Sequence, residues 1–523
     1  MQKSWRTERP SYVDRLPPCN HDCPAGENIQ AWLQLAQAGQ YEKAWQSLVE
    51  NNPLPAIMGR VCYHPCESGC NRAQFDQAVN IHAVERFLGD QAILHGWQFD
   101  AAPSSGKHVL VVGAGPSGLS AAYHLSRFGH KVTIQDAGPR AGGMMRFGIP
   151  KYRLPREILD AEIARIVNLG VTLRLNCRMD DLAAVIESKE FDAVFLAVGA
   201  HVSKRAFIPA GDASKILDAL SLLRSVDSGD PPQLGRRVLI YGGGNTALDA
   251  ARTAKRLGGS EALIVYRRTR EKMPAHDFEV REAIEEGIQF KWLSTIKEAG
   301  DTGFTVEKMR LDEKGFPQPT GEFETIEGDS LILALGQDVD LSFLERVPGV
   351  EIFGGVVKVS PQMMTGHPGL FAGGDMVPAE RTVTVAVGHG KKAARNIDAW
   401  LRGASYQPGQ RHERAIFSDL NTWSYAAAAV NVQPMLDAAL RQSTFDEVLG
   451  GLDEDHARLE ARRCLSCGNC IECDRCYEAC PDNSVVKLDP GARYRFDYDT
   501  CQGCGLCASE CPCGAIEMVS EPA

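Results

Sequence analysis

The chain has 523 residues, more than a single hydrophobic core can organise, so roughly three or four domains are expected. Hydrophobic residues make up 44% of it and charged residues 24%, which is typical of folded globular proteins and excludes disordered and fibrous classes. The formal net charge of -11 lacks the basic footprint of a nucleic-acid-binding protein, so we predict no nucleic-acid partner.

The cysteines gather at the two ends of the chain. Five of the 17 lie between Cys19 and Cys70, eleven lie between Cys464 and Cys513, and Cys177 stands alone. The first residues lack the apolar stretch of a secretory signal, and no run of residues is apolar enough to span a bilayer. We therefore expect a cytoplasmic protein, in which clustered cysteines indicate metal sites rather than disulfides.

The first elements in chain order are helical and then change to an α/β pattern. The stretch AWLQLAQAGQYEKAWQSLVE has apolar residues at helical spacing. Beyond it, the apolar strands HVLVVGAG, FDAVFLAVG, RVLIYGGG and SLILALG alternate with helical stretches. Such alternation predicts parallel sheets.

The first of these strands ends in a dinucleotide-binding fingerprint, VVGAGPSGL. Its glycines, Gly113, Gly115 and Gly118, permit a tight turn, close approach of the backbone to a pyrophosphate and close packing of the next helix. Asp136 follows at the end of the strand KVTIQD, where an acid can accept hydrogen bonds from an adenosine ribose. We predict that this unit binds FAD.

A second fingerprint, YGGGNTALDAA, follows the strand RVLIY. The residues expected to approach the nucleotide are Gly242, Gly244, Asn245, Thr246 and Ala247. Where the first unit has its acid, this unit has Arg267 and Arg268, and guanidinium groups bind a 2′-phosphate. The pattern favours NADP(H) over NAD(H); arginines on a solvated strand end are the alternative.

A third element, LFAGGDM, carries Gly374 and Asp375 ahead of a helix expected from about Val387. The acid can bond the flavin ribityl chain or pyrophosphate, and the helix N-terminus can point at the flavin pyrimidine. Its place after the NADP unit suggests that the chain returns there to the FAD domain. The segment beyond, around residues 410–460, is expected to be a helical linker.

The C-terminal cysteines form two complete C-x2-C-x2-C-x3-C-P runs, which are typical of two-cluster ferredoxins. In such ferredoxins the fourth cysteine of each run ligates the other cluster. One [4Fe-4S] cluster is therefore expected on Cys470, Cys473, Cys476 and Cys511, and the other on Cys501, Cys504, Cys507 and Cys480. Cys177 and Cys513 have no companion at ligand spacing and are expected to be spare thiols.

From about Cys19 to Leu401 the chain resembles the small subunit of glutamate synthase and its relatives, including the flavin part of dihydropyrimidine dehydrogenase. The motifs that carry the resemblance are GRVCYHPCESGC, GAGPSGLSAA, GGMMRFGIPKYRLP, GGGNTALDAA, VYRRTREKMPA and AGGD. The resemblance implies hydride transfer between NADPH and FAD, with the isoalloxazine near Gly142 and Gly143 and no catalytic side chain. The last sixty or so residues resemble the delta subunit of 2-oxoacid:ferredoxin oxidoreductases, through EACPDNSVVKL and CGLCASECPCGAIEM.

The N-terminal cysteines depart from this family, because the C-x2-C pair that precedes the match to Cys19 is replaced by YVDRLPP. A segment similar to the lost one, EARRCLSCGNC, lies just before the ferredoxin runs. The resemblance therefore suggests one [4Fe-4S] cluster on Cys19, Cys70, Cys464 and Cys467, and another on Cys23, Cys62, Cys66 and Glu85. The alternative is a single N-terminal cluster made from four of the five local cysteines.

Together these features predict an α/β protein with two Rossmann-like, glutathione-reductase-like domains, a helical iron–sulfur domain before them and a ferredoxin-like α+β domain after them. The expected segments are helical iron–sulfur (1–104), FAD (105–232 and 337–408), NADP (233–336), linker (409–463) and ferredoxin (464–523). We expect an NAD(P)H oxidoreductase subunit that exchanges electrons with ferredoxin or a partner such as a 2-oxoacid:ferredoxin oxidoreductase, in either direction. The alternative is a non-catalytic, cluster-bearing docking subunit.

Overall fold

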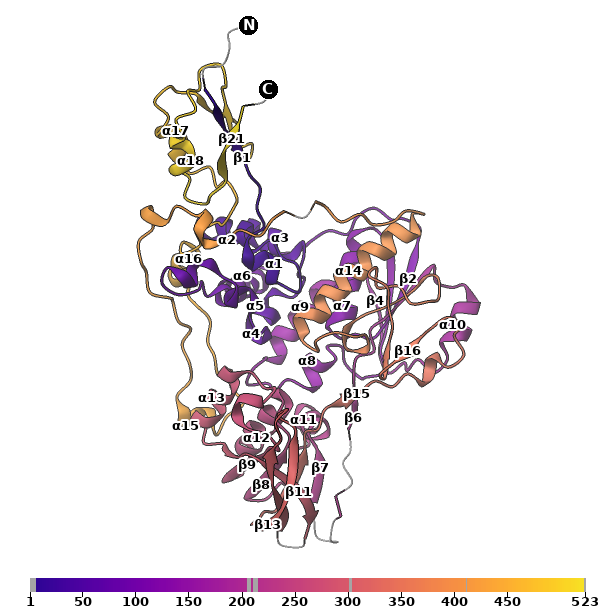
Figure 1. Cartoon of the computed structure of the whole chain (residues 1–523). Coiled ribbons are helices and arrows are strands. Elements are labelled where there is room, and N and C mark those ends of the chain that lie inside the picture. The colour runs from indigo at the N-terminus through magenta and orange to yellow at the C-terminus, as the bar shows by residue number, and fades with distance from the viewer. Residues whose placement is uncertain (1–5, 205–207, 210–214, 301–302, 411, 522–523) are drawn as a thin grey trace. The chain divides into compact units, whose positions relative to one another are not determined.

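The computed structural model describes residues 6–204, 208–209, 215–300, 303–410 and 412–521. The chain forms two compact units. The first contains the segments from both ends of the chain, Met1–Trp97, Tyr406–Gln433 and Gly451–Ala523. The second contains Gln98–Ser405 and Pro434–Gly450. Indigo and yellow ribbons therefore occur together in the first unit (Figure 1).

The second unit contains the predicted FAD-type sheet, which is parallel. Its strands lie in the order β18 (Leu370–Ala372), β5 (Ala193–Leu196), β2 (His108–Val112), β3 (Lys131–Gln135) and β4 (Thr172–Arg174). Because β18 pairs with β5 in register, the chain does return to this sheet after the NADP unit. The helices of this part are α7 (Pro116–Arg127), α8 (Met144–Phe147), α9 (Arg156–Val167), α10 (Leu182–Ser188) and α14 (Val383–Leu401).

The NADP-type sheet is also parallel, which confirms the predicted fold class. Its order is β10 (Gln289–Lys291), β9 (Glu261–Val265), β8 (Arg237–Tyr241), β14 (Ser330–Leu333) and β7 (Lys215–Asp218). Strand β7 precedes residue 233, so the boundary expected there is too late. The reason is that β7 pairs with β14, and Asp218 then caps the next helix by accepting from the backbone N–H groups of Leu220 and Ser221.

Further elements complete the second unit. Helices α11 (Ala219–Ser228), α12 (Asn245–Arg256) and α13 (Asp277–Glu285), with the short helix η2 (Arg270–Lys272), belong to the NADP part. An antiparallel sheet of β11 (Ser294–Ala299), β12 (Gly303–Leu311) and β13 (Pro317–Glu327) adds to it. Smaller elements are β6 (Val202–Ser203) with β15 (Gln337–Asp338), β16 (Ile352–Phe353) with β17 (Val356–Val357), η3 (Ser342–Leu344) and η4 (Gly374–Met376).

A buried ionic cluster ties α12 to the end of α13. Glu286 is fully buried and accepts from Arg252 at 2.6 Å and from Arg256 at 2.8 Å. The guanidinium of Arg256 lies 3.8 Å from the centre of the Tyr152 ring, which belongs to the FAD part. The cluster therefore joins the two nucleotide-binding parts of the unit.

We expect Glu286→Leu to lower the free energy of unfolding by about 3–5 kcal/mol, because it leaves two buried guanidinium groups without their carboxylate. Urea unfolding of the holoprotein, followed by tryptophan fluorescence, measures the change. Glu261→Gln is the control, since the pair of Glu261 with Arg237 is solvent-exposed and should matter far less. Equal losses in the two variants would contradict the role of the cluster.

Helices dominate the N-terminal part of the first unit. They are α1 (Pro18–Asp22), α2 (Ile29–Gln37), α3 (Tyr41–Val49), α4 (Pro55–Val61), α5 (Pro65–Ser68), η1 (Asn71–Gln74) and α6 (Ile81–His95). The predicted helical stretch forms both α2 and α3, which bury Trp32 and Trp45 completely. Helices α4 and α6 pack closely, because a Cβ at Gly89 would lie 2.3 Å from the backbone nitrogen of Ala56.

The ferredoxin part contains α17 (Arg475–Glu478), β19 (Val485–Lys487), β20 (Tyr494–Phe496), α18 (Leu506–Ser509) and β21 (Ile516–Ser520). The first strand of the chain, β1 (Glu8–Tyr12), pairs antiparallel with β21, as Figure 1 shows. Sequence analysis assigned β1 to the helical domain. The pairing also covers an otherwise open edge of β21.

The expected helical linker is mostly irregular. Its described helices are short: η5 (Phe417–Asp419), η6 (Thr422–Ser424), α15 (Ala438–Arg441) and α16 (Glu454–Ala461). The alanine run 426–429 favours a helix but is not helical, because buried arginines take its carbonyl groups. Arg72 donates to the carbonyl of Ala426 at 3.0 Å, and Arg463 donates to that of Ala428 at 3.2 Å.

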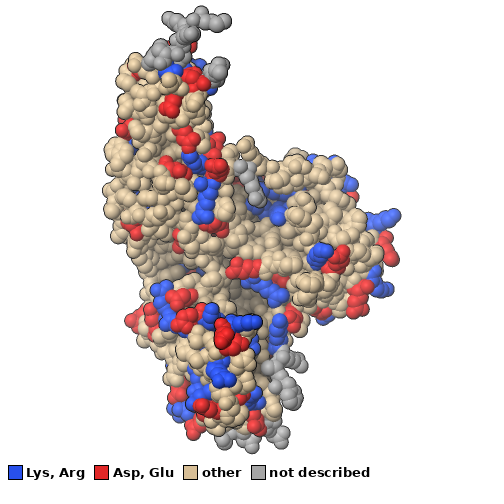
Figure 2. All heavy atoms as spheres, viewed as in Figure 1, with Lys and Arg blue, Asp and Glu red and all other residues tan. Residues whose placement is uncertain are grey.

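Charged side chains of both signs are mixed on the face of the molecule that Figure 2 shows, in keeping with the net charge of -11. None of the described helices combines the length and apolar character needed to cross a membrane.

Candidate cofactor-binding sites

The first glycine-rich turn connects β2 to α7 and tolerates no side chain at two positions. A Cβ at Gly118 would lie 1.9 Å from the carbonyl oxygen of Gly113, and a Cβ at Gly113 would lie 2.3 Å from that of Ala197. Helix α7 begins with Gly115 as its N-cap and has no side-chain cap. Its first-turn hydroxyl, Ser117 Oγ, is buried without a hydrogen-bond partner among the described residues. An open helix N-terminus with an unsatisfied donor fits a phosphate group.

Asp136 follows β3 and lies beside this turn. Its carboxylate accepts from the backbone N–H of Ala114 at 2.7 Å and from that of Gly138 at 2.7 Å. Each oxygen has a further lone pair, so the carboxylate can hold the turn and accept from a ribose as well.

Two further segments meet the turn. The backbone N–H of Gly142 donates to the carbonyl of Ala114 at 2.9 Å. A Cβ at Gly143 would lie 2.8 Å from the Cα of Gly115, and one at Gly374 would lie 3.1 Å from the Cβ of Ser117. Motifs 113–118, 142–143 and 374–375 therefore form one site.

Burial raises the pKa of the Asp375 carboxyl, against the opposing charge of Arg381. A half-buried carboxyl group of this kind is stabilised when a hydroxyl group donates a hydrogen bond to it. This environment fits the predicted bond to the flavin ribityl chain.

Helix α14 begins at Val383, four residues before the expected start, because the Thr382 side chain accepts from the N–H of Val385 at 3.2 Å and caps the helix. Sequence reasoning missed His389 on this helix, whose Nδ1 accepts from the N–H of Gly374 at 3.2 Å. No motif pointed to this histidine.

The second glycine-rich turn connects β8 to α12 in the same way. A Cβ at Gly242 would lie 2.2 Å from the carbonyl oxygen of Ala334, whereas one at Gly244, the N-cap of α12, would meet nothing within 4 Å. Asn245 and Thr246 open the helix, and Ala247 is fully buried. The space beside Gly244 suits close approach of a pyrophosphate.

Arg267 and Arg268 follow β9, the strand next to β8. Arg267 is exposed and Arg268 is half-buried, with its guanidinium 5.7 Å from the centre of the Phe316 ring. The Nε of Arg268 is buried and has no hydrogen-bond partner among the described residues. An unsatisfied guanidinium donor beside a nucleotide turn fits a 2′-phosphate.

In the first unit, the structure gathers Cys23, Cys62, Cys66 and Glu85. Burial, and then the charges of Glu27, Glu85 and Cys62, raises the pKa of the Cys23 thiol. Burial also raises the pKa of Cys66, with further contributions from Cys23, Cys62 and Glu85 among others. To bind as thiolates and a carboxylate, these four residues would need a compensating cation, which a metal cluster would supply.

Sequence reasoning missed the hydrogen bonds that hold the Glu85 carboxylate in place. Asn52, which is fully buried, donates from Nδ2 to Glu85 Oε1 at 2.7 Å and to Glu27 Oε1 at 3.0 Å. Trp32 donates from Nε1 to the other oxygen of Glu27 at 3.2 Å. Second-shell hydrogen bonds of this kind orient a carboxylate ligand.

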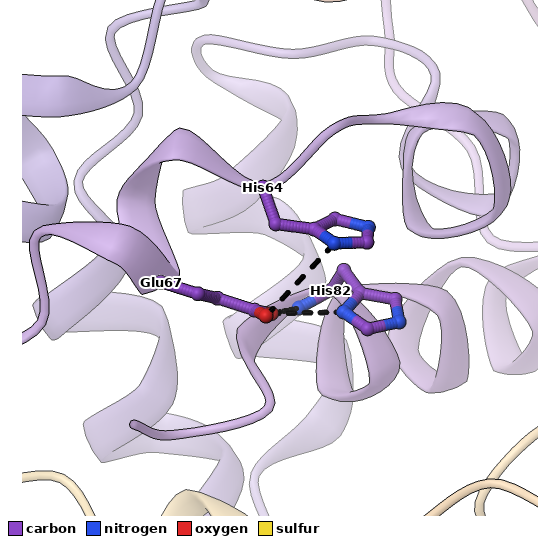
Figure 3. Close-up of side chains that lie close together, drawn as sticks. All are labelled: His64, Glu67 and His82. Atoms are coloured by element: carbon purple, nitrogen blue, oxygen red, sulfur yellow. Dashed lines mark hydrogen bonds and ion pairs between the residues drawn. The ribbon is translucent and has the colours of Figure 1, made fainter. Parts of the chain in front are cut away.

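A polar group beside Cys66 also escaped prediction. Glu67 accepts from the backbone N–H of His82 at 2.9 Å and lies 2.8 Å from its Nδ1, and the His64 and His82 rings stack at 3.7 Å (Figure 3). Despite burial, which raises it, the pKa of Glu67 is lowered by His82. His82 Nε2 lies 2.8 Å from Gln433 Oε1, so both ring nitrogens are engaged. These contacts hold α5 against α6.

Cys19, Cys70, Cys464 and Cys467 line one cavity in the first unit. Burial, and then the charges of Cys464, Cys70 and Cys467, raises the pKa of Cys19. Burial likewise raises the pKa of Cys464 to about 11 and that of Cys467 to about 12.

The ferredoxin cysteines also lie near one another in two sets. Cys480, Cys501, Cys504 and Cys507 line a second cavity. Burial, followed by Cys470, Cys511 and Cys473, raises the pKa of Cys476 to about 12. Cys513 is buried and donates to Cys511, which lowers the pKa of Cys511 to about 6. Cys177 is half-buried after β4.

Within the described parts of the chain, His64, Glu67 and His82 form the one group of three or more potential ligands whose atoms all lie within 4.8 Å of one another, and they make the hydrogen bonds given above.

Comparisons with known proteins agree with this architecture. Residues 107–390 match the family described as pyridine nucleotide-disulphide oxidoreductase. Residues 13–97 match dihydropyrimidine dehydrogenase domain II, a 4Fe-4S cluster domain, and residues 457–518 match a 4Fe-4S dicluster domain.

Three curated relatives have similar sequences. The chain is 36% identical to the beta subunit of the NADP(+)-dependent formate dehydrogenase of Moorella thermoacetica, over 86% of this chain and 70% of that one. It is 34% identical to the beta subunit of the NADPH-Fe(3+) oxidoreductase of Geobacter sulfurreducens, over 87% and 76%. It is 33% identical to the glutamate synthase [NADPH] small chain of Escherichia coli, over 74% and 89%.

The protein belongs to the pyridine nucleotide-disulphide oxidoreductase family, as an NAD(P)H-dependent flavin oxidoreductase that carries 4Fe-4S domains at both ends.

Proposed function

We propose that the chain shuttles electrons between NADP(H) and a ferredoxin, or a partner such as a 2-oxoacid:ferredoxin oxidoreductase. When bound, FAD exchanges a hydride with NADP(H) and single electrons with the clusters. When electrons flow from NADPH to the acceptor, one NADPH and two oxidised one-electron carriers give NADP⁺, one proton and two reduced carriers. The observation that carries the proposal is that one chain presents two open nucleotide turns and several buried cysteine sets.

The residues of the first turn would hold FAD. The N-terminus of α7 and Ser117 would bind the pyrophosphate, Asp136 the ribose, and Asp375 the ribityl chain. Gly143 would leave space for the flavin beside the turn. None of these groups needs to move a proton, because the cofactor carries the hydride chemistry.

The residues of the second turn would hold NADP(H). Gly244 would let the backbone approach the pyrophosphate at the N-terminus of α12, which Asn245 and Thr246 open. Arg268, with its unsatisfied Nε, would bind the 2′-phosphate, and the exposed Arg267 would add a second guanidinium.

Three cysteine sets would carry [4Fe-4S] clusters in the segments that match cluster domains. The N-terminal set is Cys23, Cys62, Cys66 and Glu85; the ferredoxin sets are Cys470, Cys473, Cys476 and Cys511, and Cys480, Cys501, Cys504 and Cys507. One cysteine of each ferredoxin set, Cys473 or Cys504, is exposed. Electrons would leave the chain at these exposed ligands.

The names of two relatives support a partner protein. Both are beta subunits, one of a formate dehydrogenase and one of an NADPH-Fe(3+) oxidoreductase. We therefore propose that a catalytic subunit or a free ferredoxin docks near an exposed cluster ligand. Purification of the untagged protein from its host, followed by identification of the copurifying chains, would name that partner.

Steady-state turnover tests the proposed activity against the docking alternative. Under anaerobic conditions, the holoprotein should oxidise NADPH and reduce two equivalents of ferredoxin for each NADPH. A docking subunit with a non-catalytic flavin fold would oxidise none. A fully loaded protein that neither reduces ferredoxin with NADPH nor reduces NADP⁺ with reduced ferredoxin would overturn the proposal.

A further inference from the structure

Two cysteines from each end of the chain meet in a cavity that no matched cluster domain explains alone. Cys19 and Cys70 lie in the segment matched at 13–97, and Cys464 and Cys467 lie in the segment matched at 457–518. The four cysteines line a single cavity. The cavity brings the two N-terminal cysteines to the two C-terminal ones, although even the nearest pair in sequence, Cys70 and Cys464, is 394 positions apart.

The cavity offers the sulfur atoms hydrogen-bond donors. The backbone N–H of Ser466 lies 3.4 Å from Cys464 Sγ, and Asn71 Nδ2 lies 3.5 Å from Cys467 Sγ. Asn71 is itself buried, at 6% exposure, and also donates to the carbonyl of Ala415 at 3.2 Å. N–H donors of this kind stabilise thiolate ligands and tune cluster potentials.

A buried ionic network fixes the two halves of the cavity together. Asp76 accepts from Arg72 at 2.6 Å and from Arg463 at 3.1 Å, and Arg463 also binds Glu460 at 2.6 Å. Arg72 donates to the carbonyl of Arg463 at 3.0 Å, directly before Cys464. The backbone segments that carry Cys70 and Cys464 are therefore held together by contacts between the two ends of the chain.

We propose that Cys19, Cys70, Cys464 and Cys467 hold a [4Fe-4S] cluster that joins the two ends of the chain. Four cysteines are the usual ligand set of such a cluster.

Chain connectivity places this cluster between the others. Cys467 is three residues from Cys470, and Cys19 is four residues from Cys23, so their Cα atoms are at most about 14 Å apart. The order would be the Glu85 cluster, the joining cluster, the Cys470 cluster and the Cys480 cluster. This order rests on the proposed function; the joining cluster itself does not.

Iron analysis of the anaerobically purified full-length protein tests the cluster. We expect four clusters, or about sixteen irons per chain, rather than about twelve. Cys464→Ser with Cys467→Ser should remove about four irons, and Cys19→Ser with Cys70→Ser should remove the same four. The quadruple variant should lose no more than either double variant, because the four residues share one cluster. Cys177→Ser is the matched control and should lose none.

The outcomes separate the cluster from the function. About twelve irons in the wild type, no loss in the Cys464 and Cys467 variant, additive losses in the quadruple variant, or zinc in place of iron would each overturn the joining cluster. Retained flavin and ferredoxin electron paramagnetic resonance signals show that a variant is folded. If a double variant does not fold, the wild-type iron count decides: about sixteen irons support the joining cluster and about twelve overturn it. A wild type with four clusters but no NADPH-driven ferredoxin reduction would refute the function alone.

Discussion

Gly118→Ala is expected to abolish FAD retention while the ferredoxin clusters still assemble. Even one methyl group at this position would lie 1.9 Å from the carbonyl oxygen of Gly113, and backbone atoms cannot move aside cheaply. The clash would push α7 away from β2 and open the turn that receives the pyrophosphate. Flavin released on denaturation, per mole of protein, measures the effect, and a larger residue should act at least as strongly.

Two matched glycine variants locate the cause. A Cβ at Gly115 has its nearest neighbour at 3.9 Å, and one at Gly244 has none within 4 Å. Gly115→Ala should therefore fold normally but weaken FAD binding by crowding the pyrophosphate, and Gly244→Ala should weaken NADPH binding and spare FAD. Asp375→Ala should also lower flavin content. Full flavin content in both the Gly118 and Asp375 variants would contradict this site.

Replacing Arg267 and Arg268 with alanine should raise the Michaelis constant for NADPH far more than that for NADH. Loss of a charge-assisted phosphate contact costs roughly 1.5–3 kcal/mol, or about 10- to 150-fold in affinity. NADH lacks the 2′-phosphate, so its binding should change little. Steady-state kinetics with each nucleotide measures the ratio.

Arg270→Ala is the control for this experiment. Arg270 lies in the same segment but already pairs with Asp277 at 3.1 Å, so its loss should leave the nucleotide preference unchanged. If the wild-type protein uses NADH with an efficiency equal to or greater than that for NADPH, the assignment of the two arginines is wrong.

Local patterns were sufficient to predict the nucleotide-binding parts. A fingerprint such as GAGPSG encodes the strand, the turn and the helix within a few residues, and Asp136 and Arg268 follow at fixed distances along the chain. The return of the chain to the FAD sheet could also be predicted, because the AGGD motif has a role only beside the first turn. The crossed ferredoxin pattern follows from its internal symmetry.

Long-range contacts decided the features that local patterns could not predict. Strand β1 pairs with β21, at the opposite end of the chain, and nothing in its five residues indicates that partner. The alanine run 426–429 favours a helix until Arg72 and Arg463 bind its carbonyl groups. Asn52 and His389 act through tertiary contacts, and neither belongs to a motif.

The central claim is that NADPH delivers electrons through FAD to the clusters of the same chain. Rapid anaerobic mixing of the oxidised holoprotein with NADPH, followed by absorbance and by freeze-quenched electron paramagnetic resonance, tests it most directly. We predict that the flavin band bleaches first and that reduced-cluster signals then appear without a partner protein, whereas the Gly118→Ala variant shows neither. If the wild-type clusters stay oxidised after mixing with NADPH, although dithionite can reduce them in a separate sample, the result would contradict the account.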